Sequence, residues 1–192
     1  MKTNFLAAAA LSAAIVAPHA AQAQSVPAAV IVTVDTQRIF AECTACKAAQ
    51  TQLQSQQTAL QQLEQTLQTP LQTEADAIRT ALAGKNPDQA DAATKARITA
   101  FQAKGQQAQT QLQARAQTFQ RNRAYVSEQI NAKLNPIITA VMQAKKANIA
   151  VDVQATLAAA SSIDVTDEVM TQLNSQLPSV STTAPAAAAP AR

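Results

Sequence analysis

The chain contains two cysteines, Cys43 and Cys46, which form the motif Cys-Thr-Ala-Cys. This C-x-x-C spacing can make a redox centre, half of a metal site or a local disulfide, and two small residues one helical turn apart can also pack simply as apolar side chains. In thioredoxin-like enzymes the reactive cysteine lies at a helix N-terminus, where the helix dipole stabilises the thiolate. Here the helix is expected to begin near Thr36, so Cys43 would lie about two turns inside it. We therefore expect the cysteines to be structural; a Cys43–Cys46 disulfide is sterically conceivable but would strain a regular helix.

Other side chains for catalysis or cofactor binding are scarce. The one histidine, His19, lies in an N-terminal segment that we expect to be removed, so no Cys-His or Ser-His pair remains. A zinc site takes about four ligands, and one chain offers two thiols without a nearby histidine. The two glycines are 21 residues apart and cannot form a Walker-type phosphate-binding loop. The sequence predicts no enzyme activity, no cofactor and no metal site.

The first residues have the pattern of a secretory signal peptide. Lys2 provides a basic start, an apolar run extends from Phe5 to Ala17, and Ala21-Gln22-Ala23 offers an A-x-A cleavage site. The apolar run is too short to anchor the chain across a bilayer. We expect residues 1–23 to be cleaved near Ala23 and the protein to be exported.

The composition favours long helices over a compact globular fold. Hydrophobic residues make up 47% of the chain with alanine dominant, while aromatic residues make up 3% and tryptophan is absent. Such a chain has little with which to fill a large core, whereas Ala, Gln and Leu are good helix formers. The formal net charge of +3 is too weak to indicate nucleic-acid binding.

Two long stretches, 39–78 and 98–133, have coiled-coil spacing, with seam positions that advance in alternating steps of four and three. Between them, Gly-Lys-Asn-Pro-Asp at 84–88 offers a helix end, an N-cap and a first-turn proline for a second helix. Residues 37–133 should therefore form an antiparallel helical hairpin with its tip at 84–88.

Two residues weaken the predicted hairpin at nearly the same height. Pro70 removes a backbone donor from the first helix, and Gly105 removes side-chain packing from the second. This coincidence predicts a bend or hinge, although a tolerated kink without any role fits the pattern equally well.

The segments that flank the hairpin, residues 24–36 and 134–177, contain short β-branched stretches. Strands are expected at 30–34 and 149–153, with a weaker one around 155–160. The residues expected to form an association body are Val30, Val32, Val34, Ile149, Val151 and Val153. Three short strands cannot make an independently stable sheet, so several copies of the chain would have to pool them.

The C-terminal part should contain two short helices. Asn135-Pro136 is expected to restart a helix after the hairpin, and Asp164 is expected to be the N-cap of a last amphipathic helix. Residues 178–192 are rich in Pro, Ala, Ser and Thr and are expected to be disordered.

Three stretches outside the hairpin carry a resemblance to a known family. They read VIVTVDTQRIF at 30–40, ANIAVDV at 147–153 and IDVTDEVMTQLN at 163–174. Together with the N-terminal signal pattern and the Gln- and Ala-rich hairpin, they resemble the Skp/OmpH family of periplasmic chaperones over about residues 29–177. The resemblance implies a mainly α fold with a small β body, in which a long antiparallel hairpin projects from a trimeric, barrel-like association body of strands and helices.

The resemblance also implies a function. Members of this family hold unfolded outer-membrane β-barrel proteins in a cavity between the arms without ATP, which predicts a periplasmic homotrimer with such clients, weak contact with lipid surfaces and no nucleic-acid partner. Family arms are typically strongly basic, but residues 50–130 carry eight basic against six acidic residues, so electrostatic capture should be weaker here. Two alternatives stay open: a structural coiled-coil protein of the cell envelope without clients, and a C-x-x-C redox protein.

Client capture by many weak contacts would use side chains of the hairpin. The apolar candidates are Leu53, Leu63, Leu82, Phe101 and Phe119. The basic candidates are Arg79, Lys85, Lys95, Arg97 and Lys104. On spacing alone, each apolar residue is more often part of a helix–helix seam, and each basic residue is more often part of a solvated face.

Overall fold

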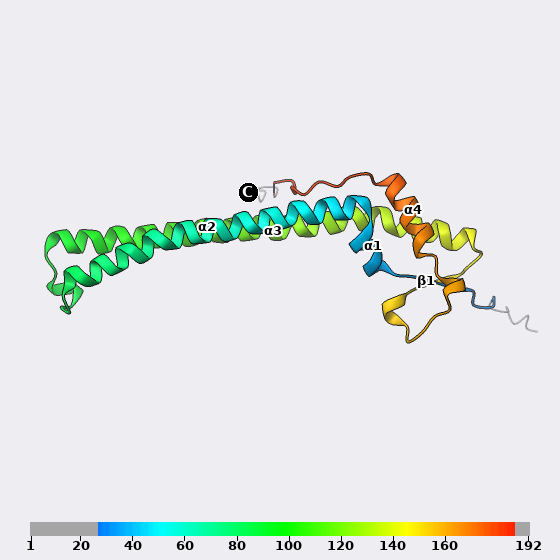
Figure 1. Ribbon diagram of the computed structural model, residues 1–192, viewed down its shortest axis with the longest axis horizontal. Helices are drawn as coiled ribbons and strands as arrows, with labels where there is room; N and C mark the ends of the chain where they lie inside the picture. The colour runs from blue at the N-terminus through cyan, green and yellow to red at the C-terminus, as the bar shows by residue number, and fades with distance from the viewer. Residues whose placement is uncertain (1–26, 187–192) are drawn as a thin grey trace, which may run out of the picture.

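The structure is a computed structural model that describes residues 27–186. It is mainly helical with a small β component, as predicted. The elements in chain order are β1 (Ile31–Val34), α1 (Thr36–Glu42), α2 (Thr44–Leu82), the 3₁₀ turn η1 (Pro87–Gln89), α3 (Ala92–Ala144), β2 (Ile149–Asp152), the 3₁₀ turns η2 (Val153–Ala155) and η3 (Ser161–Ile163), and α4 (Thr166–Gln176). Helices α2 and α3 form a long antiparallel hairpin, the arm, which projects from a body that contains β1, α1, β2, α4 and the end of α3 (Figure 1). The predicted signal peptide lies outside the described residues.

The first long helix is interrupted at Cys43. A single helix from about residue 36 was predicted, but Cys43 has a ψ of 145°, which is far from helical and separates α1 from α2. The bend brings Ile39 of α1 and Cys46 of α2 into one apolar cluster, and it places Arg38 of α1 2.8 Å from the carboxylate of Asp167 on α4. Packing of two segments against the same core therefore overrides local helix continuity.

Helix α3 has 53 residues and, at about 1.5 Å per residue, is about 80 Å long. The predicted break at Asn135-Pro136 is wrong, because the helix continues through Pro136. A proline inside a helix costs about 3 kcal/mol. Around it, however, Leu134, Ile137 and Val141 are 1%, 2% and 0% exposed, and burial of each such side chain contributes about 1.5–3 kcal/mol. Their packing against the body keeps the helix intact.

The tip of the arm is longer than a tight turn. Helix α2 ends where Ala83 and Gly84 adopt the left-handed conformation, with φ of 47° and 82°. Asn86 and Pro87, which were expected to start the second helix, form only η1, and the Asn86 side chain makes no cap hydrogen bond. Helix α3 begins at Ala92 because the carboxylate of Asp91 accepts a hydrogen bond from Thr94 N at 2.7 Å and caps it there.

The body contains a parallel pair of strands, with Ile31 opposite Ile149 in register. The weaker strand predicted at 155–160 is not formed, and within residues 27–186 the sheet has two strands. The stretch is Ala-rich and has few β-branched side chains, which explains its irregular structure. On β1, Thr33 instead forms an isolated parallel bridge with Asp164.

Helix α4 begins at Thr166 and packs back onto α3. Asp164 was expected as its N-cap; by geometry the N-cap is Val165, but the Asp164 carboxylate accepts a hydrogen bond from Thr166 N at 2.8 Å. Val169 and Leu173 are fully buried, so α4 closes the core where the arm joins the body.

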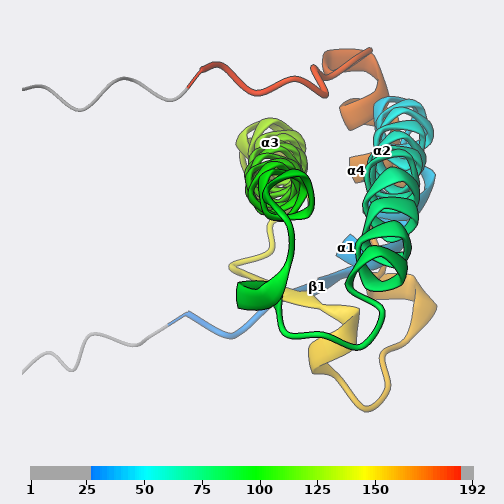
Figure 2. The same ribbon diagram turned by 90° about the vertical axis from the view of Figure 1, so that its left-hand side faces the viewer.

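The C-terminal segment 178–186, which we call the strap, differs from the prediction of disorder. It leaves α4 and runs back along the arm (Figure 1), and in the view down the arm it lies above α2 and α3 (Figure 2). Thr182 is 7% exposed, and hydrogen bonds join residues 181–184 to side chains of both arm helices. The prediction failed because composition describes the segment alone, whereas its backbone groups find partners on distant helices. Residues 187–192 lie outside the described part of the chain.

Candidate functional site

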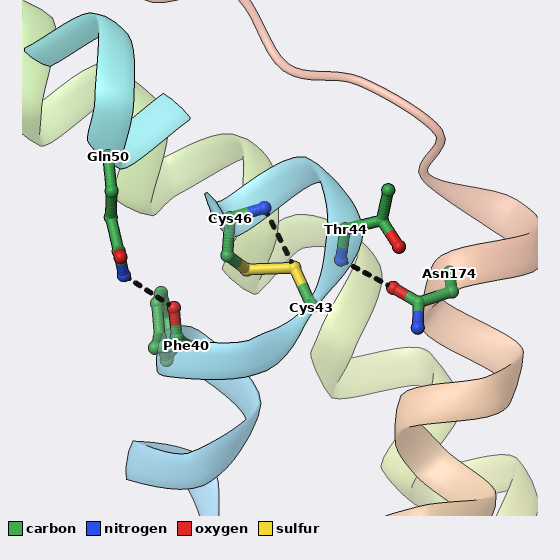
Figure 3. The surroundings of a disulfide bond; sticks show 6 residues. All are labelled: Phe40, Cys43, Thr44, Cys46, Gln50 and Asn174. Atoms are coloured by element: carbon green, nitrogen blue, oxygen red, sulfur yellow. Dashed lines mark hydrogen bonds between the residues drawn. A yellow bond between two sulfur atoms is a disulfide. The ribbon is translucent and has the colours of Figure 1, made fainter. Parts of the chain in front are cut away.

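A disulfide lies at the root of the arm, where α2 begins. Cys43 and Cys46 are bonded to each other, and Cys43 is the N-cap of α2, with its sulfur 3.0 Å from Cys46 N (Figure 3). Side chains satisfy the backbone groups freed by the break, because Asn174 Oδ1 accepts from Thr44 N at 2.8 Å and Gln50 Nε2 donates to Phe40 O at 3.0 Å. The expectation that Cys43 lies two turns inside a helix is therefore wrong.

A helix N-terminus is where reactive C-x-x-C motifs occur, but burial separates this disulfide from them. Cys43 and Cys46 are 0% and 2% exposed and belong to the apolar cluster that contains Ile39 and Ile130. Exchange with a protein dithiol requires direct access of a thiolate to a sulfur atom. The disulfide therefore acts as a structural link between α1 and α2 in the folded chain.

The predicted apolar candidates are all half-buried, but they do not form one site. Leu63 and Phe119 line the same cavity of about 460 Å³ on the arm, together with Leu60. Leu53 instead packs against the core at the root, and Phe101 lines a separate cavity of about 570 Å³ nearer the tip. The arm therefore carries a series of shallow grooves along its length.

The middle of the arm is loosely packed. Pro70 lines a cavity of about 560 Å³ with Leu67 and Ala108, and Gly105 lines another of about 610 Å³ that contains the same two residues. Both helices are continuous through Pro70 and Gly105. A Cβ atom added at Gly105 would meet no atom within 4 Å, so packing does not demand glycine there.

The predicted basic residues divide into paired and free groups. Arg97 donates to both carboxylate oxygens of Glu74 at 2.9 and 3.1 Å, and this hydrogen bonding lowers the pKa of Glu74 below its ordinary value. Arg79 pairs with Asp76 one turn away at 2.7 Å. Among residues 27–186, the exposed Lys85, Lys95 and Lys104 form no ion pair within 4.0 Å. Of the five predicted basic residues, the three lysines are therefore the ones without an acidic partner in the described part of the chain.

A cluster of amides near the root of the arm was not predicted from the sequence. We call Gln52 and Gln56 of α2 with Asn122 and Gln129 of α3 the amide cluster. Asn122 is 6% exposed and donates from Nδ2 to Gln56 Oε1 at 2.8 Å, which joins the two helices. The one available signal was a polar Asn at a seam position, which in coiled coils often specifies a particular partner.

The body residues chosen from the sequence have two environments. Val32 and Val34 are buried in the core, and Val151 and Val153 are half-buried. Val30 and its neighbours Ile31 and Ile149 are 45%, 42% and 41% exposed, and Leu157 is also exposed. The strand pair thus presents apolar surface to solvent.

The part of the chain that the structure describes has neither a membrane-spanning nor a metal-binding pattern. No helix within residues 27–186 combines the length and apolarity needed to cross a membrane. No group of three or more His, Cys, Asp or Glu side chains in the same residues is arranged to hold a metal ion.

Comparisons with known proteins agree on one family. No curated protein matches the chain. The solved structure of a proposed OmpH-like outer membrane chaperone from Caulobacter crescentus CB15 has the same fold, with a TM-score of 0.66 and 20% sequence identity, and the match covers 82% of this chain and 90% of that one. The family described as "Outer membrane protein (OmpH-like)", whose members are not enzymes, matches residues 30–173. The chain therefore belongs to the OmpH-like family.

Proposed function

We propose that this protein is a periplasmic, ATP-independent holdase that binds unfolded outer-membrane β-barrel proteins and prevents their aggregation. The observation that carries the proposal is the arm: two helices pack closely at the root, but farther out they leave a series of shallow, partly apolar grooves. An unfolded chain offers many weakly binding segments, and summed weak contacts retain it without a specific pocket.

The assembly in this proposal is a homotrimer. It is supported by the exposed apolar side chains Val30, Ile31 and Ile149 in and beside the sheet, which has two strands within residues 27–186. Such a sheet is marginal alone and gains stability when copies associate. Three arms that project from a shared body would enclose a cavity for the client. Size-exclusion chromatography with light scattering tests this assembly, and a monomer at micromolar concentration would contradict it.

The holdase activity is tested by dilution of a urea-denatured β-barrel membrane protein with and without the purified chain. Light scattering should rise more slowly in its presence. If the chain is instead a structural coiled-coil spacer, scattering rises at the same rate in both samples.

A matched pair of variants locates the contacts. Leu63→Gln with Phe119→Gln changes two residues that line one cavity and should weaken suppression of aggregation, because an apolar groove becomes polar. Ala103→Gln with Ala114→Gln, at exposed positions of α3, is the control and should suppress as well as the parent. Equal activity of both variants would remove this cavity from the client-binding surface.

Weak contact with anionic lipid surfaces is proposed for the exposed lysines Lys85 and Lys95 near the tip. Each lysine near such a surface contributes about 1 kcal/mol. Co-sedimentation with vesicles that contain anionic lipid should therefore fall when both are changed to Gln, and unchanged binding would contradict this contact.

A further inference from the structure

The strap is held chiefly through its main chain. Gln129 donates from Nε2 to Ser181 O at 2.9 Å and accepts from Ser181 N at 3.0 Å, which pairs a side-chain amide with the backbone N–H and C=O of one residue. Gln56 Nε2 donates to Thr182 O at 3.0 Å, and Ala184 N donates to Asn122 Oδ1 at 2.9 Å. All four bonds use backbone atoms of the strap, which every polypeptide has. The amide cluster therefore recognises a peptide largely without regard to its side chains.

The amides are oriented by the arm as well as by the strap. Asn122 Nδ2 donates to Gln56 Oε1 at 2.8 Å, and Gln129 Nε2 also donates to Tyr125 O at 3.0 Å in its own helix. Asn122 is nearly buried, so its orientation is restricted by packing. A site held in this way loses less conformational freedom when it binds a peptide.

The strap makes one further contact with the cluster and leaves a neighbouring cavity open. The hydroxyl of Thr182 donates to Gln52 Oε1 at 2.6 Å, and Thr182 is nearly buried. Thr183 lines the cavity of about 460 Å³ that also contains Leu63 and Phe119. A peptide with a large apolar side chain in place of Thr183 would add apolar burial that the strap lacks.

We propose that the amide cluster and this cavity form a binding site for unfolded peptide segments, and that the strap is an internal occupant which clients must displace. The inference rests on the proposed holdase function and adds a mode of recognition and a form of regulation to it. The strands of membrane β-barrels alternate apolar and polar residues, so their unfolded chains supply main-chain groups beside apolar side chains at many positions.

Tethering makes the strap an effective competitor. Leu177 and Val180 pack against the core and anchor the start of the strap. Residues 181–184, which contact the amide cluster, follow directly after Val180. A short tether gives an effective concentration in the millimolar range. A single weak peptide therefore competes poorly, whereas a long unfolded client with many segments and contacts elsewhere on the arm displaces the strap.

The test compares strap variants in the full chain. Ser181→Pro with Ala184→Pro removes the two strap N–H groups that bind Gln129 and Asn122. The control, Ser179→Pro with Ala186→Pro, adds two prolines at exposed positions whose N–H groups make no hydrogen bond within residues 27–186. Fluorescence anisotropy of a labelled peptide with the sequence LPSVSTTAPA, residues 177–186, measures the dissociation constant.

The S181P/A184P chain should bind the labelled peptide about tenfold or more tightly than the parent, because the intramolecular competitor is weakened. The S179P/A186P chain should match the parent. Equal affinities of the two proline variants would overturn the autoinhibitory role of the strap.

A second change tests the site itself in the S181P/A184P background. Gln129→Ala should weaken peptide binding about tenfold, because it removes both hydrogen bonds to the backbone N–H and C=O of one residue. Gln120→Ala is the control, because Gln120 is exposed on α3 and its side chain makes no hydrogen bond to any residue in 27–186. Unchanged affinity with Gln129→Ala would overturn the site, and circular dichroism melting of each variant confirms that it is folded.

Failure of this inference can be distinguished from failure of the holdase proposal. If the parent suppresses aggregation of the β-barrel protein but S181P/A184P binds the peptide no better, only the strap's role is wrong. If no variant slows aggregation, the holdase function is wrong whatever the peptide does.

Discussion

The guanidinium of Arg97 in α3 faces the carboxylate of Glu74 in α2, with donor–acceptor distances of 2.9 and 3.1 Å. Within residues 27–186 this is the one ion pair that joins the two arm helices. It lies in the outer part of the arm, where the buried apolar seam is thin and Ile78 is the last buried hydrophobic residue of α2. The pair therefore sets the register of the helices near the tip.

Replacement of Glu74 by Gln should loosen the outer arm without changing global stability. Arg97 is exposed and Glu74 is only half-buried, so the melting temperature should stay nearly constant, but amide hydrogen exchange should accelerate near residues 74–97. Asp76→Asn, which breaks an ion pair within one helix, is the control and should leave exchange in α3 unchanged. Identical exchange in the two variants would contradict the assigned role.

Removal of the disulfide should lower stability but leave client holding intact. Cys43→Ser with Cys46→Ser opens a closed loop of about four residues, for which the chain-entropy relation gives about 2 kcal/mol. Serine retains an oxygen able to cap α2. Thermal melting measures the loss, and the aggregation assay well below the melting temperature should give the parent's result. A loss of suppression by a folded variant would indicate a functional redox site.

Stiffening the middle of the arm tests the proposed hinge. Gly105→Ala adds a Cβ into open space and should stabilise α3 by about 1 kcal/mol, and Pro70→Ala should stabilise α2 by up to about 3 kcal/mol. If bending admits clients, the double variant melts at a higher temperature and suppresses aggregation less well. Ala103→Gln, at an exposed position two residues from Gly105 that lines neither cavity, is the control. A stiffened arm with undiminished suppression would show that Pro70 and Gly105 are tolerated kinks.

Two buried threonines of the body should respond oppositely to replacement by valine. Thr33 Oγ1 is buried and has no hydrogen-bond partner within residues 27–186, so Thr33→Val should stabilise the fold by about 1 kcal/mol. Thr166 Oγ1 accepts from Asp35 N at 2.9 Å and bonds to Asp164, so Thr166→Val should destabilise it by about 1–3 kcal/mol. Urea unfolding measures the free energy of unfolding of both variants. Destabilisation by Thr33→Val would contradict the prediction for Thr33.

Acid should destabilise the body through two carboxylates. The hydroxyl of Thr36 lowers the pKa of Asp152, and the hydroxyl and N–H of Thr166 lower the pKa of Asp164, each below the ordinary value of 3.8. The unfolded chain then binds protons more readily than the native chain, so this stability is present above pH 3.8 and is lost as the pH falls through the lowered values.

The melting temperature should therefore fall as the pH drops below 3.8. The Thr36→Val variant should show a shallower fall, because Asp152 loses its principal hydrogen bond. An equally steep fall in the variant would remove Asp152 from the acid response.

Features that depend on local pattern could be predicted from the amino-acid sequence. The four-and-three spacing predicts long helices, Asp35 is an effective N-cap because its carboxylate reaches Arg38 N at 2.8 Å, and the β-branched stretches at 30–34 and 149–153 predict β1 and β2. These outcomes depend on residues a few positions apart. The motifs outside the arm likewise sufficed to indicate the family.

Features in which local preference competes with packing against distant residues could not be predicted in this way. Cys43 breaks a helix that its neighbours favour, Pro136 stays inside a helix that it should end, and the strap is ordered although its composition favours disorder. In each case a local term of a few kcal/mol is outweighed by burial or hydrogen bonds to residues distant in sequence. The partners of these segments lie up to about 130 positions away in the sequence, as in the hydrogen bond between Thr182 and Gln52. A local sequence pattern does not indicate such distant partners.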